Sequence, residues 1–74
     1  MSDTFRVSVT SPPDREKLVA EIWFGDEHVA EINQEKGELQ IEIYARRSDE
    51  PWAFPHADYM EALSQARHRL VGPG

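Results

Sequence analysis

The chain has 74 residues, a net charge of −6 and no cysteine. This length indicates one domain, residues 1–74, with a core of modest size. The lack of cysteine excludes disulfide bonds and thiolate metal sites. The acidic balance argues against nucleic-acid binding, which usually needs clustered Lys and Arg. No apolar run approaches the roughly 20 residues of a membrane helix, and the N-terminal MSDTFRVSV lacks a signal-peptide pattern, so we expect a cytoplasmic protein without membrane association.

Four segments alternate between apolar and polar side chains with the period of two that is typical of β-strands. They are FRVSVTS (5–11), KLVAEIWF (17–24), HVAEIN (28–33) and ELQIEIYA (38–45). The two prolines of SPPDRE interrupt the first pair, and GDE and QEKG have the composition of turns. Because short turns join antiparallel neighbours, these segments predict an antiparallel meander.

The segment DYMEALSQARHRLVG, residues 58–72, predicts a helix. Asp58 and Glu61 have the spacing of a capping box at its start. Gly72 is placed to follow its last turn, where a left-handed residue is common. One face carries an apolar stripe at helical spacing, made of Tyr59, Leu63, Ala66 and Leu70.

The predicted order gives an α+β fold, a four-stranded antiparallel β-meander with one C-terminal α-helix packed on one face. The strand side chains expected to face the helix are Phe5, Val7, Val9, Leu18, Ala20, Ile22, Phe24, Ala30, Ile32, Leu39, Ile41 and Ile43. Trp52 and Phe54, in the loop that precedes the helix, are expected to be ordered and to close one edge of this core. One helix leaves the other sheet face open.

The net charge lies in the segment that builds this open face. Between residues 21 and 43, seven acidic side chains accompany one lysine, and each flanking segment is neutral. The residues that share the outward phase include Val19, Glu21, Trp23, Val29, Glu31, Glu42 and Tyr44. Aromatic residues are enriched where proteins grip one another. We therefore predict a partner-binding site made of Glu21, Trp23, Glu31, Glu42 and Tyr44.

Two plainer interpretations of the open face remain. The glutamates can be an ordinary solvated surface that keeps the sheet soluble. Trp23 can lie beneath the PWAFP loop as part of a second small core.

The sequence offers no arrangement typical of an enzyme. His28, His56 and His68 show no HxxxH or HExxH spacing, and there is no phosphate-binding loop or nucleophile elbow. We therefore predict no catalytic residues, no metal ligands and no cofactor, and we interpret the protein as a non-enzyme.

SPPDREKLVAEIWFGDEHVAEINQEKGELQIEIYARR, residues 11–47, and PWAF, residues 51–54, resemble small acidic single-domain bacterial proteins of similar length. In size, acidity and lack of catalytic motifs, the chain also resembles immunity proteins that neutralise polymorphic or contact-dependent toxins. This resemblance implies an inhibitor whose acidic sheet face and aromatic anchors bind a basic protein such as a toxin domain. It carries over no site residues.

The alternative function is that of a self-associating structural or regulatory domain, a homodimer through the open sheet face. The carboxylates of two copies would then face and repel each other unless Arg6, Arg46 or Arg47 paired with them.

Overall fold

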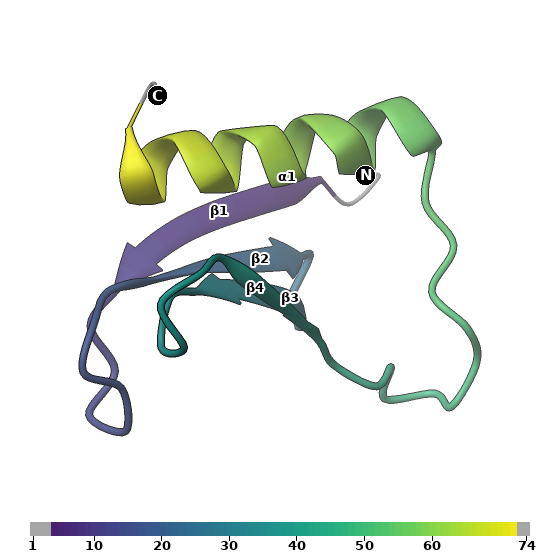
Figure 1. Ribbon diagram of the computed structural model, residues 1–74. Helices are drawn as coiled ribbons and strands as arrows, with labels where there is room; N and C mark the ends of the chain where they lie inside the picture. The colour runs from purple at the N-terminus through teal and green to yellow at the C-terminus, as the bar shows by residue number, and fades with distance from the viewer. Residues whose placement is uncertain (1–3, 73–74) are drawn as a thin grey trace.

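The computed structural model describes residues 4–72, so residues 1–3 and 73–74 of the predicted domain lie outside the described residues. It has four strands and one helix: β1 (Phe5–Thr10), β2 (Val19–Phe24), β3 (Glu27–Asn33), β4 (Gln40–Ile43) and α1 (His56–Val71). The strands form one antiparallel sheet in the order β1-β2-β3-β4, and α1 lies on one side of it (Figure 1). The predicted α+β meander with one C-terminal helix is confirmed. Within residues 4–72, no helix has the length and apolar character needed to cross a membrane.

The sheet contains one irregularity, a bulge between β2 and β3. Ile22 pairs with Ala30 but Trp23 pairs with His28, which leaves Val29 as an extra residue in β3. A bulge shifts the alternation of side chains by one position. Val29 therefore packs in the core, where it is only 1% exposed, and the prediction that it lies on the outer face is wrong.

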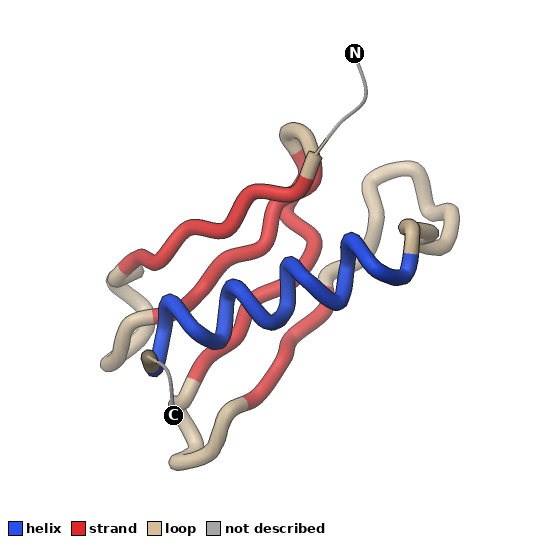
Figure 2. The backbone as a smooth tube through the Cα atoms, turned by 90° about the horizontal axis from the view of Figure 1, so that it is seen from above, coloured by secondary structure: helices blue, strands red, loops and turns tan. Residues whose placement is uncertain are grey.

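The helix runs diagonally across the sheet and packs mainly on β1 and β2 (Figure 2). Ala62 and Ala66 are buried at this contact, and their small side chains let the helix lie close to the strands. Tyr59, Leu63 and Leu70 pack beside them, so the predicted stripe is confirmed and Ala62 extends it.

The far side of the same sheet face is poorly covered, because α1 does not extend over β4. Leu39, Ile41 and Ile43 point to the helix side but are 39%, 44% and 63% exposed. Leu18, which precedes β2, is 50% exposed. The prediction that these four residues belong to the core is wrong.

The helix begins two residues earlier than predicted. Pro55 is its N-cap and makes no side-chain cap hydrogen bond, while Asp58 lies inside the first turn. The predicted capping role of Asp58 is therefore wrong, although a carboxylate in the first turn still suits the helix dipole. Gly72 has a φ of 81° and its N–H donates to His68 O at 2.8 Å, as expected of a residue that ends a helix.

The loop between β4 and α1 is tied to the core by its aromatic residues. The Phe54 ring lies 4.8 Å from that of Phe5 and 4.9 Å from that of Phe24, between centroids. Trp52 donates its indole N–H to Tyr44 O at 2.8 Å. The prediction that this loop is ordered and closes one edge of the core is confirmed.

The helix–sheet contact can be tested by placing a charge in it. Ala66 is fully buried, so Ala66→Asp puts an unpaired carboxylate between α1 and the sheet and should unfold the domain. Ser64→Asp adds the same charge on the exposed side of α1 and should leave the thermal midpoint nearly unchanged. Circular dichroism melts of both variants measure this difference. Equal melting of the two variants would mean that α1 packs through another face.

Candidate functional site

The outer face is the side of the sheet away from α1, and all five predicted site residues lie on it. Strand register places Glu31 between Glu21 and Glu42, so that three carboxylates form a row across β2, β3 and β4. Trp23 and Tyr44 join this row through hydrogen bonds. The Trp23 indole N–H donates to Glu21 at 3.2 Å, and the Tyr44 hydroxyl donates to Glu31 at 3.1 Å.

Glu31 is the centre of the row and is nearly buried, with 7% of its side chain exposed. Its second carboxylate oxygen accepts from Asn33 Nδ2 at 3.1 Å and lies 2.9 Å from Arg15 Nη2. Both oxygens therefore have partners inside the protein. A buried carboxylate with these partners holds the face together, and it cannot itself reach a binding partner.

Arg15 supplies the positive charge that lets the carboxylates stand side by side. Its Nη2 also lies 2.8 Å from Glu42 Oε2, so one guanidinium bridges β3 and β4. Asn33 Nδ2 donates to the same Glu42 oxygen at 2.6 Å. Like charges directly opposite each other in a sheet are destabilising, and the guanidinium offsets this repulsion between Glu31 and Glu42.

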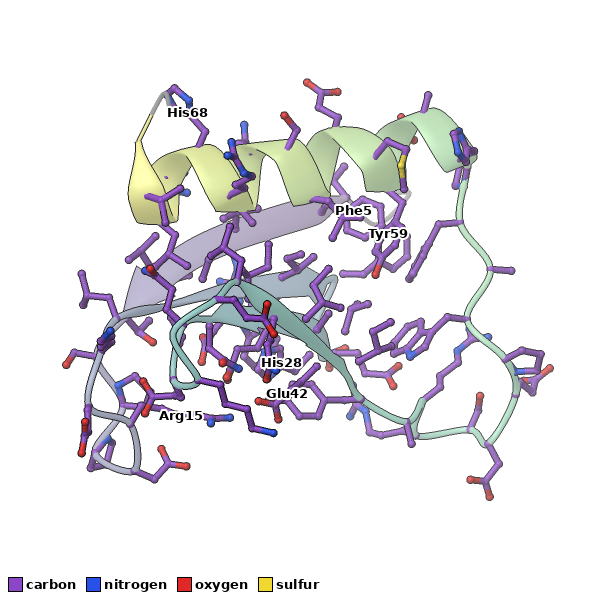
Figure 3. All side chains as sticks on the ribbon, in the orientation of Figure 1. Phe5, Arg15, His28, Glu42, Tyr59 and His68 are labelled. Carbon is purple, nitrogen blue, oxygen red and sulfur yellow. The ribbon has the colours of Figure 1, made fainter. Side chains whose placement is uncertain are left out.

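Arg15 lies in the connection between β1 and β2, which is on the outer side of the sheet (Figure 3). Figure 3 shows Arg15, His28 and Glu42 on this side, whereas Phe5 and Tyr59 lie between the sheet and α1. Val19, predicted on the outer face, is completely buried there. The outer face is therefore covered at one end and open at the other.

A second row of side chains on the outer face is aromatic. The His28 ring stacks on Trp23 with centroids 4.7 Å apart and planes 6° from parallel, and it lies 4.7 Å from the Tyr44 ring. The Arg6 guanidinium lies 5.4 Å from the Trp23 ring centroid. Trp23 thus has neighbours on both sides within the sheet. Trp52 and Phe54 of the PWAFP loop pack against the core on the helix side, so the interpretation that Trp23 lies under that loop is wrong.

The charge of this face changes the acidity of two groups. Burial, followed by the neighbouring Glu31 carboxylate, raises the pKa of the Tyr44 hydroxyl above its ordinary value. Desolvation would lower the pKa of Arg15, but the carboxylates of Glu31 and Glu42 outweigh it and raise that pKa. Both groups therefore keep their protons throughout the neutral range.

Three residues of this site were not predicted from the sequence. Arg15 lies in a proline-containing loop, and no periodicity connects it with the strands. His28 reaches the outer face only because of the bulge at Val29. Asn33 has the same phase as Glu31, but its role as a donor to two carboxylates depends on strand register.

Each of the three arginines that could offset the repulsion in a homodimer has a contact within the chain. Arg47 pairs with Asp26 at 2.9 Å, Arg46 lies over the Trp52 ring, and Arg6 lies over the Trp23 ring. Among residues 4–72, no group of three or more histidine, aspartate or glutamate side chains is arranged to hold a metal ion. The face thus combines accessible carboxylates with aromatic side chains, and aromatic side chains are enriched at protein interfaces.

The bridge made by Arg15 can be tested by comparing its removal with the removal of another cation from the same connection. Arg15→Ala leaves Glu31 buried without its cation and should lower the free energy of unfolding by about 1–3 kcal/mol. Lys17→Ala removes one exposed cation from the same connection and should change it by less than about 0.5 kcal/mol. Adding Glu31→Gln to Arg15→Ala should recover part of the loss. Urea unfolding measures all three variants, and equal effects of Arg15→Ala and Lys17→Ala would refute the bridge.

The raised pKa of Tyr44 predicts a loss of stability in alkali. Above about pH 10, the ordinary tyrosine pKa, the unfolded chain releases the Tyr44 proton while the folded chain keeps it. The contribution of the Tyr44 hydroxyl to the free energy of unfolding is therefore complete below that pH and falls as the pH rises. Tyr44→Phe should lose less stability than wild type between roughly pH 9 and 11. Parallel urea-unfolding profiles of wild type and Tyr44→Phe would contradict this assignment.

Comparison with known proteins finds no relative that could be compared at the outer face. No protein-family model, no curated protein and no solved structure matches this chain.

Proposed function

We propose that this protein is a non-catalytic protein-binding module that presents its outer sheet face to a basic protein. The observation that carries the proposal is that Glu21, Trp23, Glu42 and Tyr44 share a face that α1 leaves uncovered. Acidic groups at such a surface speed encounter with a basic partner, and aromatic side chains slow its dissociation.

The carboxylates of the face divide into two roles. Glu31 is 7% exposed and fixes the arrangement, whereas Glu42 retains 43% exposure of its side chain. The carboxylates available to a partner are therefore Glu21 and Glu42, and Trp23 beside Glu21 is the main apolar anchor.

A nuclease-type toxin domain is the partner class that we propose, as for the immunity proteins that the chain resembles. Clefts that bind phosphate are lined with Lys and Arg, and an acidic surface can occupy them. The absence of cysteine means that the fold needs no oxidising compartment, which is compatible with inhibition in the cytoplasm.

A homodimer through the same face is less well supported. It would set Glu21 and Glu42 of two copies against each other. Arg47, Arg46 and Arg6 contact Asp26, Trp52 and Trp23 of their own copy, so each would have to leave that contact to offset this repulsion. A basic partner removes the difficulty, because each carboxylate then meets a cation.

The proposal is tested by a pair of charge reversals at different places. Glu21→Lys lies on the outer face, and Glu61→Lys makes the same change on the exposed side of α1. The partner captured from the source cell should associate several-fold more slowly with Glu21→Lys, and this difference should shrink with salt, which screens charges over about 10 Å at 0.1 M. Glu61→Lys should bind like wild type.

Trp23→Ala tests the aromatic anchor separately. It should speed dissociation of the captured partner while changing the association rate little. A melt of the variant checks that the sheet stays folded. If the folded Trp23→Ala and Glu21→Lys variants both bound with wild-type rates, the outer face would be ordinary solvated surface.

A further inference from the structure

The β1 edge of the sheet is covered by a charged side chain of α1. At the β1 edge, Arg69 of α1 donates to Val7 O at 2.6 Å. Gly25 N donates to Thr4 O, and the alternation of an antiparallel ladder then turns the backbone groups of Val7 away from β2. Arg69 therefore covers the free edge of β1 with a charged side chain, a common protection against pairing with another chain.

The β4 edge has its own free backbone groups. Tyr44 N donates to Val29 O at 2.9 Å, so Glu42 and Gln40 also direct their N–H and C=O groups toward β3. The groups of Leu39, Ile41 and Ile43 consequently point outward.

The aliphatic side chains at this edge are also partly exposed. Leu39, Ile41 and Ile43 are 39%, 44% and 63% exposed. Between β4 and α1 lies an open hollow of about 290 Å³ whose aliphatic lining includes Ile32, Ile41 and Leu63. An exposed apolar strand without a charged or proline residue among its outward-pointing positions is an expected site of strand pairing.

We propose that β4 pairs antiparallel with β4 of a second copy of this chain, with Ile41 opposite Ile41. This inference concerns a surface outside the outer-face site and does not depend on the proposed function. Only backbone N–H and C=O groups that point away from β3 can hydrogen-bond to a second copy. Leu39, Ile41 and Ile43 of one copy therefore face the same three residues of the other.

The charges select one register. With Ile41 at the two-fold axis, Leu39 meets Ile43 on the helix side and Gln40 meets Glu42 on the outer side. Moving the axis to Glu42 would set two Glu42 carboxylates against each other, which is unfavourable. Moving it to Gln40 would leave Ile43 without an aliphatic partner. The edge is thus self-complementary about Ile41.

This pairing keeps both helices on the same side of one eight-stranded sheet. The two outer faces become a continuous acidic surface on the opposite side. Each copy carries a charge of −6, so the copies repel over long range. Salt should therefore strengthen this dimer, whereas it should weaken the binding of a basic partner to the outer face.

The mass of the full chain in solution is the first test. Sedimentation should show a species of twice 8.5 kDa that grows with concentration up to about 1 mM and with added salt. Ile41→Lys places two cations at the axis and should abolish it. Leu18→Lys changes an equally exposed aliphatic residue two strands away from β4 and should leave it intact. A wild-type monomer throughout this range, or a dimer that survives Ile41→Lys, would overturn the proposal.

Single cysteines test the register, because the described chain has no cysteine of its own. In a hydrogen-bonded antiparallel pair, Cα atoms lie about 5.5 Å apart, within the range of a disulfide. Ile41→Cys should therefore oxidise rapidly to a covalent dimer. In Ile43→Cys, the two thiols are separated by four residues along the strands, about 13 Å, and should oxidise several-fold more slowly despite greater exposure. Faster oxidation of Ile43→Cys would rule out the axis at Ile41.

Discussion

One helix cannot cover four strands, and most features of this protein follow from that constraint. A helix with its side chains is about 10 Å wide, and neighbouring strands lie about 4.8 Å apart. α1 packs on β1 and β2, where Ala62 and Ala66 allow close approach. Aromatic rings from the loop before α1 close one end of the layer. β4 remains at the margin, with its aliphatic side chains partly in water, and the outer face has no second layer apart from the β1–β2 connection at one end.

The outer face is stabilised by charge rather than by a second core. Three carboxylates stand in register across β2, β3 and β4, an arrangement that repulsion alone would disfavour. Arg15 bridges two of them, and Asn33 and Tyr44 satisfy the remaining acceptors of Glu31. Since a buried carboxylate needs each of these partners, the network also fixes the connection between β1 and β2 against the sheet.

Because the single helix leaves both the outer face and the β4 edge uncovered, the sheet has two exposed surfaces with different chemistry. The outer face offers accessible carboxylates around an aromatic row, which suits a basic protein. The β4 edge offers outward backbone groups and aliphatic side chains, which suit another strand. Because these surfaces lie on a face and an edge of one sheet, occupation of one does not block the other. A pairing along β4 would widen the acidic face without changing its composition.

The sequence by itself determined the strands, the helix and their order, because period-two alternation and helical spacing are local properties that neighbouring residues set. It also placed Glu21, Trp23, Glu31, Glu42 and Tyr44 on a common face, since alternation within each strand decides which side a residue takes. Only the tertiary structure decided which of these side chains are accessible. The bulge at Val29 exchanged a valine for His28 on the outer face, and strand register brought Glu31 between Glu21 and Glu42. The β1–β2 connection, distant from Glu31 in the sequence, folds so that Arg15 pairs with Glu31 and covers it. Contacts of this kind depend on the distance between segments in space, which the local pattern of a sequence does not encode.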